Sequence, residues 1–486
     1  MQTALNKTVL LLVLLWGIAG SGHATPAIEA FASLPTLTDL EIAPNGRFVA
    51  ARMVLENRYR VVVLEDKGQQ FEVVFVLSED DEISAKWFHW ANEDTLLVSF
   101  GFVRQRGPDF ETQERRLFSV TMGENELRPL FWKQREERSL QIQDRVVSFL
   151  PDDPDHILLQ YNRANPREPE VFKVHVSERQ RHRRVMASKT TVRSWGADNN
   201  GEVRVARGID GNGRPTLFFR DPGERDWRDF SARVEPEGAV FRPVGFTSDP
   251  NVIYVLSNHD VDPAGLYTFN LMTETFGDLI YAHPTVDIAS VDVSQQTGEV
   301  VSLNFVDDDL ETIWFNARPI NQSIRALERH FPGKSLTTHG VSLDGGHAVL
   351  KVAGGRDAGQ FMVFNSVAKR VTMMPLQYTA LPAGELGITI PTEYAAADGL
   401  IIPAFVTLPP GITSLDAAKN LPFVVNPHGG PTSRDFLRFS FDVQFLASRG
   451  YGVLQMNFRG SSGYGTAFKK AGDREWGQAM QDDITD

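Results

Sequence analysis

A unit made of an apolar strand, a polar turn and a second apolar strand recurs along most of the chain. Its turns are rich in Asp, Asn, Pro and Gly, the residues that favour tight reversals between strands. The copies read LEIAPNGRFVAARM from Leu40, FHWANEDTLLVSF from Phe88, VVSFLPDDPDHILLQY from Val146, WGADNNGEVRVAR from Trp195, VGFTSDPNVIYVLS from Val244, VDVSQQTGEVVSLNF from Val291 and HGVSLDGGHAVLKV from His339. They number about seven and lie roughly 47 to 60 residues apart, a period that indicates a repeat architecture.

A second hairpin signal follows each copy. These second units read RYRVVVLEDKGQQFEVV, RRLFSVTMGENELRPLF, EVFKVHVSERQRHRRV, PTLFFRDPGERDWRDF, GLYTFNLMTETFGDLI, ETIWFNARPINQSI and GQFMVFNSVAKRVTMM. Two hairpins make a four-stranded antiparallel sheet, and such sheets repeated around an axis make a β-propeller. Residues 38–376 are therefore predicted to form a seven-bladed propeller, preceded by a lead segment over residues 25–37. A stack of β-sandwiches is the alternative, but sandwich strands need not keep this two-hairpin register.

Composition and charge narrow the classes of function. The chain has 486 residues, 42% of them hydrophobic and 23% charged, which is typical of a globular protein with two or three domains. Its formal net charge is -13, so no basic field attracts nucleic acid or an anionic membrane surface. We therefore expect neither partner, beyond the contact that an export signal makes with a membrane.

The N-terminus has the pattern of an export signal. Lys7 precedes an apolar run from Val9 to Ala19, and Gly22-His23-Ala24 is a small-x-small sequence suited to signal peptidase. Residues 1–24 are predicted to be removed, which gives a periplasmic or secreted protein; an uncleaved anchor is the alternative. The chain contains no cysteine, so its stability is expected to come from core burial without disulfides.

The pattern changes after Pro382, where a second domain over residues 377–486 is predicted. Two strands are expected on either side of Ala397-Asp398-Gly399, and a short buried strand over Leu421–Val425. A helix is expected over Phe439–Arg449, then a buried strand in YGVLQMNF and a further helix in AFKKAGDREWGQAMQDDITD. This alternation is typical of the beginning of a doubly wound α/β sheet, in which ligands bind at the carboxyl ends of the strands.

The sequence HGGP follows the expected strand Leu421–Val425 after Asn426 and Pro427. Two glycines let the backbone turn sharply and leave its N–H groups uncovered, so that an oxyanion can approach them. In α/β-hydrolases the corresponding loop supplies one oxyanion donor, and the residue after the nucleophile supplies the other. In this context HGGP favours an acyl-transfer site.

Three segments of this domain, NPHGGPTSRD, FLASRGYGVLQMNFRGSSGYG and AGDREWGQAMQDDITD, together resemble the start of the catalytic domain of the prolyl oligopeptidase family of serine peptidases. The similarity is strongest to its acylaminoacyl-peptidase-like and bacterial dipeptidyl-peptidase-like branches. It implies a propeller followed by an α/β-hydrolase domain that cleaves short peptides with a Ser, Asp, His triad. A peptide substrate and no cofactor are implied as well.

The resemblance assigns roles to individual residues. The oxyanion loop is matched by His428, Gly429, Gly430 and Pro431, with the N–H of Gly430 or its neighbour as donor. The loop that shapes the cleft is matched by Arg459, Gly460, Gly463, Tyr464 and Gly465, with Arg459 as an anchor. The helix that leads toward the nucleophile strand is matched by Trp476, Gly477, Asp482 and Asp483, for which packing and helix-end hydrogen bonding are the expected roles.

The family's nucleophile elbow, GxSxG, does not occur among the 486 residues. Gly460-Ser461-Ser462-Gly463 lacks its spacing, so neither serine is expected to be the nucleophile. We expect this sequence to be truncated, the polypeptide alone to have no peptidase activity, and its sheet to expose a hydrophobic edge. Two alternatives stay open: a binding or scaffolding propeller with a degenerate hydrolase remnant, and a non-peptidase acyl hydrolase.

No metal site is predicted. The 11 histidines show no HxH or HxxxH pairing that suits zinc, and Asp307-Asp308-Asp309 lacks the glycine and closing glutamate of a calcium loop. Glu136 and Glu137 are weak candidates for holding a substrate's amino terminus, since propeller glutamates do so in dipeptidyl peptidases of the family. Residue preference, exopeptidase or endopeptidase cleavage, and oligomeric state are left open by the sequence.

Overall fold

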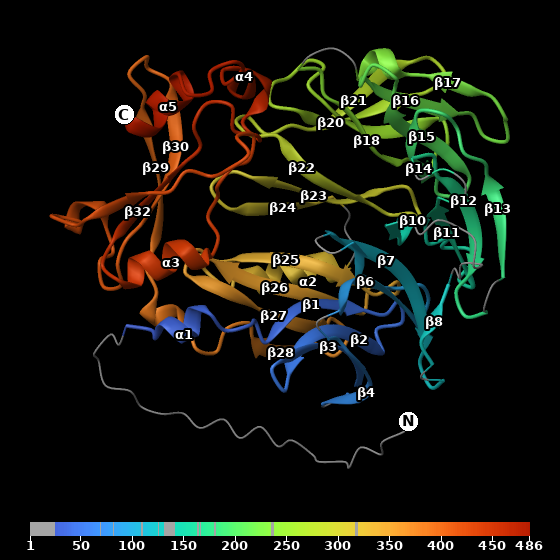
Figure 1. The fold of residues 1–486 in the computed structure, drawn as a ribbon, viewed down its shortest axis with the longest axis horizontal. Helices are drawn as coiled ribbons and strands as arrows, with labels where there is room; N and C mark the ends of the chain where they lie inside the picture. The colour runs from blue at the N-terminus through green and yellow to red at the C-terminus, as the bar shows by residue number, and fades with distance from the viewer. Residues whose placement is uncertain are drawn as a thin grey trace.

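The computed structural model describes residues 25–486 except positions 69, 81, 108–109, 125, 131–140, 163–164, 166, 179–180, 235–237 and 316–318. The predicted export signal over residues 1–24 and the pair Glu136-Glu137 lie outside these described residues. The described chain is mostly antiparallel β-sheet, with few and short helices (Figure 1).

Seven consecutive sheets form the seven predicted blades. Blade 1 contains β1 (Leu37–Ile42), β2 (Phe48–Leu55), β3 (Arg58–Asp66) and β4 (Phe71–Ser78); blade 2 contains β5 (Ile83–Trp90), β6 (Thr95–Gly107), β7 (Phe110–Thr121) and β8 (Arg128–Pro129), with β9 (Ile142–Gln143) paired to β7. Blade 3 contains β10 (Arg145–Ser148), β11 (His156–Tyr161), β12 (Glu170–His175) and β13 (His182–Met186); blade 4 contains β14 (Val192–Ala197), β15 (Val203–Ile209), β16 (Pro215–Arg220) and β17 (Trp227–Asp229), followed by the 3-10 turn η1 (Ser231–Arg233). Blade 5 contains β18 (Phe241–Phe246), β19 (Val252–Ser257), β20 (Gly265–Asn270) and β21 (Thr275–Tyr281); blade 6 contains β22 (Ile288–Val293), β23 (Val300–Val306) and β24 (Leu310–Trp314); blade 7 contains β25 (Ser335–Val341), β26 (His347–Gly354), β27 (Asp357–Asn365) and β28 (Arg370–Leu376). Each blade is built from consecutive strands, as the hairpin repeat predicts.

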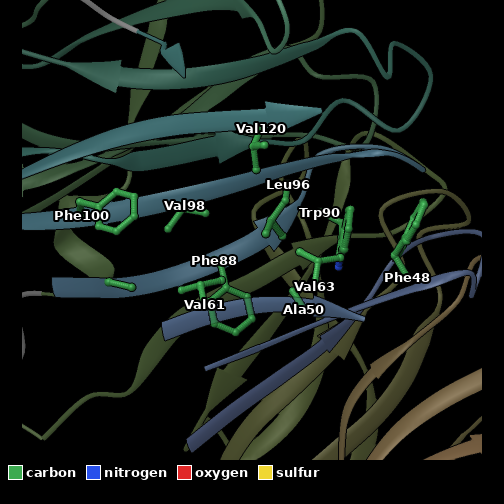
Figure 2. Close-up of a cluster of buried hydrophobic side chains, with 12 residues drawn as sticks. Phe48, Ala50, Val61, Val63, Phe88, Trp90, Leu96, Val98, Phe100 and Val120 are labelled. Carbon is green, nitrogen blue, oxygen red and sulfur yellow. The ribbon is translucent and has the colours of Figure 1, made fainter. Parts of the chain in front are cut away.

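The blades hold together because alternate side chains of one strand point to opposite faces of its sheet. In β3, Val61 and Val63 pack toward blade 2, while Val62 and Leu64 pack toward blade 7. Figure 2 shows the cluster between blades 1 and 2, where Trp90 lies among the valines and phenylalanines of both sheets. Burial on both faces explains why these strands read as nearly continuous apolar runs instead of alternating ones.

The ring closes between the first and last blades. Val349 and Phe361 of blade 7 pack in one buried cluster with blade 1. Beside this cluster, Thr36 donates its N–H to the carbonyl of Gln377 at 2.8 Å, and the Gln377 side chain donates to the carbonyl of Leu37 at 2.9 Å. Seven buried clusters, one at each junction between neighbouring blades, therefore account for the closed propeller.

The prediction of a second hairpin in blade 6 was wrong. The segment ETIWFNARPINQSI supplies β24, but its later part lies in helix α2 (Pro319–Glu328). Proline is favoured in the first turn of a helix, and Ile320, Ile324 and Leu327 recur at helical spacing. These side chains pack with Trp314 in the cluster between blades 6 and 7, so α2 covers this junction.

A second, smaller sheet follows the propeller. Its elements are the 3-10 turn η2 (Ala383–Glu385), β29 (Thr389–Ala395), β30 (Ile401–Thr407), the 3-10 turn η3 (Leu415–Ala417), β31 (Phe423–Val425), α3 (Phe441–Ser448), β32 (Gly452–Met456), α4 (Gly465–Lys470) and α5 (Ala479–Thr485). The strand order is β29-β30-β32-β31, and β31 runs parallel to β32. Near the N-terminus, α1 (Ile28–Phe31) packs against α3 through an edge-to-face contact of Phe31 with Phe445. The propeller and the beginning of an α/β-hydrolase domain are thus both present, as predicted.

Two details of this domain differ from the prediction. Strand β31 is not buried: it pairs on one side only, and Phe423 and Val425 are each 47% exposed. The helix expected after RGSSGYG is divided into α4 and α5 by turns over residues 471–478. Arg474 and Gly477 in these turns have φ values of 65° and 70°, which no right-handed helix can contain.

Within the described ranges, no helix combines the length and the apolar character needed to cross a bilayer.

Candidate active site

The loop after β31 presents unused backbone donors. Gly430 has φ 125°, and a Cβ there would come within 3.0 Å of the backbone nitrogens of Thr432 and Ser433, so a side chain would be strained. Gly429 and Gly430 are both exposed. In the described part of the chain, neither of their N–H groups donates a hydrogen bond to another protein group. The predicted oxyanion loop therefore has the open donors that its proposed chemistry requires.

His428 is fixed by the segment that follows β32 (Gly452–Met456). Its Nε2 lies 2.9 Å from the hydroxyl oxygen of Ser461, and its ring stacks on Phe458 with centroids 4.6 Å apart. The hydroxyl oxygen of Ser461 also lies 2.6 Å from the carbonyl oxygen of Phe458. The Nδ1 atom of the His428 ring lies 3.1 Å from the carbonyl oxygen of Gly429, so the tautomer of the imidazole decides which of His428 and Ser461 donates in their hydrogen bond. Ser461 is fully buried, so it orients the loop and is not placed to attack a substrate.

Arg459 ties the RGSSGYG loop to the end of the described chain. Its Nη2 donates to Asp483 at 2.6 Å, its backbone N–H donates to the same carboxylate at 2.9 Å, and its Nη1 donates to Asp398 at 2.8 Å. Asp483 is fully buried. Hydrogen bonds to Asp483, and then to Asp398, raise the pKa of Arg459. These charge-assisted hydrogen bonds hold the segment after β32 against α5.

Tyr464 forms the other side of the loop. Its hydroxyl accepts a hydrogen bond from Asn457 at 2.7 Å, and burial raises the pKa of this phenol. The guanidinium of Arg434 lies over its ring, 4.1 Å from the centroid. A Cβ at Gly463 would lie 2.5 Å from Nη1 of Arg434, so glycine is required for this arrangement. Asn457 also bonds both backbone groups of Asp435, and the two glycine loops are thereby held side by side.

The propeller holds this loop from the other side. Asp287 donates its N–H to the carbonyl of Gly463 at 2.9 Å, and its carboxylate accepts from the N–H of Gly465 at 3.3 Å. Asp262 accepts hydrogen bonds from the N–H groups of Thr466 and Ala467 at 2.6 and 3.0 Å. Sequence reasoning missed both aspartates, because each is an ordinary loop residue in a blade.

The Asp307-Asp308-Asp309 turn also contacts the second domain. The carbonyl of Asp307 accepts from Arg434 at 3.1 Å, and that of Asp308 accepts from the N–H of Leu437 at 2.8 Å. Burial raises the pKa of Asp308 and Asp309. The turn thus contributes to a contact between the domains through its backbone.

Three of the remaining predicted residues, Trp476, Gly477 and Asp482, lie apart from the two glycine loops. Trp476 is 71% exposed, and Gly477 and Asp482 are exposed as well. Gly460 lies within the RGSSGYG loop, where it is buried and packs against Gly472 and Met480.

Among the described residues, no group of three or more Asp, Glu or His side chains is arranged to hold a metal ion.

Comparison with known proteins supports this arrangement. Residues 437–486 match the model of the prolyl oligopeptidase family. Dipeptidyl aminopeptidase BIII of Pseudoxanthomonas mexicana is 23% identical over 478 residues, which cover 96% of this chain and 65% of that protein. Dipeptidyl peptidase family member 6 of Caenorhabditis elegans is 24% identical over 313 residues, which cover 60% of this chain and 42% of that protein. The chain thus spans 65% or less of the length of these two curated relatives.

Solved structures share the fold. A puromycin-hydrolyzing peptidase of Mycobacterium tuberculosis superposes with a TM-score of 0.64 at 16% identity, covering 95% of this chain and 72% of that one. Prolyl oligopeptidase B of Galerina marginata gives a TM-score of 0.65 at 12% identity, covering 94% and 66%. The propeller, the paired glycine loops and the sequence match over the last 50 residues agree. The described chain therefore has the fold of these solved structures, and its residues 437–486 match the prolyl oligopeptidase family in sequence.

Proposed function

We propose that this protein is a serine-type peptidase that hydrolyses short peptides by acyl transfer and releases dipeptides or acylated amino acids. The observation that carries the proposal is the loop His428–Pro431, whose two glycines are exposed and whose glycine N–H groups have no protein acceptor among the described residues. The names of the relatives, two of which are dipeptidyl peptidases, support a peptide substrate.

In the proposed mechanism, a serine activated by histidine attacks the peptide carbonyl. The N–H of Gly430 or its neighbour donates to the oxyanion of the tetrahedral intermediate. Collapse of this intermediate breaks the peptide C–N bond, the histidine gives its proton to the leaving amine, and water then hydrolyses the acyl-enzyme. His428 positions the loop through Ser461. The sequence contains no GxSxG, so under this proposal the nucleophile and its partners lie outside these residues, and the 486-residue polypeptide alone hydrolyses no peptide.

We further propose export to the periplasm or the outside of the cell, with removal of residues 1–24. The support is the charged, apolar and small-x-small pattern of the N-terminus. Mass spectrometry of the protein from its natural host tests this directly: the mature chain should begin at Thr25. A chain that retains Met1 or the apolar run would contradict it.

Hydrolysis of chromogenic dipeptidyl and acetyl-aminoacyl anilides tests the activity. The protein expressed from its complete reading frame should cleave at least one of them, and Gly430→Ala should lower kcat by about 10²–10³-fold because the oxyanion donor is displaced. Gly384→Ala is the matched control, since no atom lies within 4 Å of a Cβ at that position. Cleavage of simple esters without any cleavage of anilides or peptides would favour a different acyl hydrolase and contradict the peptidase proposal.

A further inference from the structure

Three arginines from successive blades gather at one end of the propeller. Arg145 begins β10 of blade 3, Arg207 lies near the end of β15 of blade 4, and Arg242 lies near the beginning of β18 of blade 5. First and second strands of a blade are antiparallel, so the beginning of the first and the end of the second lie at the same end of the sheet. All three side chains are exposed to solvent.

This end of the propeller faces the candidate active site. Arg242 donates from Nη2 to the carbonyl of Ala289 at 2.9 Å, near the beginning of β22. Asp287, directly before β22, donates to the carbonyl of Gly463 in the cleft loop at 2.9 Å. The arginine cluster and the RGSSGYG loop are therefore joined through only a few residues of blade 6.

Among the described residues, no carboxylate neutralises the positive charges of the cluster. No ion pair joins any of the three arginines to an Asp or Glu of the described residues. Arg207 donates from Nη2 to the neutral carbonyl of Pro243 at 2.9 Å. Some other propeller arginines are paired: Arg47, for example, lies 2.8 Å from Glu65.

The surroundings of Arg207 show that the charges are close together. Burial lowers the pKa of Arg207, and the charges of Arg145 and Arg242 lower it further. Solvent reaches the side chain, yet protein surrounds it, as expected for a position inside a propeller. In a chain of net charge -13, three adjacent unpaired cations are costly unless an anion binds to them.

We propose that Arg145, Arg207 and Arg242 bind a carboxylate of the peptide substrate, either its C-terminal carboxylate or an acidic side chain. Guanidinium groups present planar pairs of N–H donors that match the two oxygens of a carboxylate. The inference rests on the proposed peptidase function and adds a substrate class: short peptides that carry a negative charge. The cluster holds the charged part of the peptide while the scissile bond lies at the glycine loops.

Calorimetric titration of the protein with three acetylated tripeptides tests this proposal without requiring hydrolysis. The first is trialanine with a free carboxylate, the second is its C-terminal amide, and the third is an amide with a central glutamate. The charged peptides should bind about tenfold more tightly than the neutral amide. Preference for the first over the third assigns the site to the C-terminal carboxylate, and the reverse order assigns it to an acidic side chain.

Arg145→Gln and Arg207→Gln should each remove most of this preference. The Arg145 side chain makes no hydrogen bond to the described residues, so its replacement should leave the fold intact. Arg225→Gln is the matched control, because Arg225 is exposed on the turn between β16 and β17, at the opposite end of blade 4; it should retain the preference within about twofold.

Two results would overturn the proposal and are distinguishable. If charged and neutral peptides bind equally and Arg145→Gln changes nothing, the arginines do not select a carboxylate, although the peptidase function stands. If no peptide binds to the protein from its complete reading frame, and no anilide is cleaved by it, both proposals fail.

Discussion

Arg459 and Asp483 form a buried, multiply hydrogen-bonded ion pair that fixes the end of β32 to α5. The two residues lie on separate segments of the second domain, and the RGSSGYG loop begins at this pair. The pair therefore helps to hold the RGSSGYG loop in place.

Asp483→Asn should lower the free energy of unfolding of the second domain by about 3 kcal/mol, because it leaves a buried guanidinium without its main counter-charge. Urea denaturation followed by tryptophan fluorescence measures the loss. Asp482→Asn is the matched control, since this neighbouring carboxylate is exposed and should change stability by less than about 0.5 kcal/mol. Equal effects of the two substitutions would refute the role of the pair.

Ser461→Ala tests whether this serine is a positioning residue. It removes the hydrogen-bond partner of Nε2 of His428 and should destabilise the domain by about 1–3 kcal/mol. If Ser461 only positions His428, the variant of the active full-length protein should still react covalently with a fluorophosphonate, although more slowly. Ser462→Ala should resemble wild type in both assays. Complete loss of covalent labelling in a folded Ser461→Ala protein would instead identify Ser461 as the nucleophile.

Stability should fall in alkaline solution because of Tyr394. Burial, followed by the charges of Asp483 and Asp486, raises its pKa from 10.0 to about 12. The unfolded chain ionises at the lower value, so the contribution of this phenol is fully present below pH 10 and is lost as pH rises toward 12. Tyr394→Phe should flatten the decline between these pH values. Parallel stability curves for the two proteins would show that this phenol does not titrate as described.

Asp262 should hold the beginning of α4 against the propeller. Asp262→Ala removes the acceptor of the Thr466 and Ala467 N–H groups, and hydrogen exchange at these two amides should accelerate about fivefold, since a lost cap costs about 1 kcal/mol. Asp260→Ala, an exposed change in the same loop, should leave exchange unaltered. Unchanged protection in Asp262→Ala would show that the contact does not order the loop.

Local patterns in the sequence were sufficient for much of this structure. The hairpin repeat predicted the blades because each blade is made of consecutive strands, and HGGP and RGSSGYG marked both loops of the candidate site. The helix α2 was missed because β-branched residues and Trp314 favoured a strand, although Pro319 and the spacing of Ile320 and Ile324 fit a helix. Asp287 and Asp262 could not be predicted, since they meet Gly465 and Thr466 across 178 and 204 positions of sequence.

The burial of β31 was also misjudged, for a physical reason. An apolar run such as Phe423–Val425 is consistent with a central strand, but whether it is covered depends on neighbours that periodicity does not reveal. Its exposed Phe423 and Val425 agree with the expected hydrophobic edge of the sheet.

Fluorophosphonate labelling of the protein from its complete reading frame, with the modified residue mapped by mass spectrometry, tests the central claim most directly. The account predicts one labelled serine outside residues 1–486, and weaker labelling when Gly430 is replaced by alanine. A label on Ser461 or Ser462, or an unlabelled protein that hydrolyses no peptide, would contradict it.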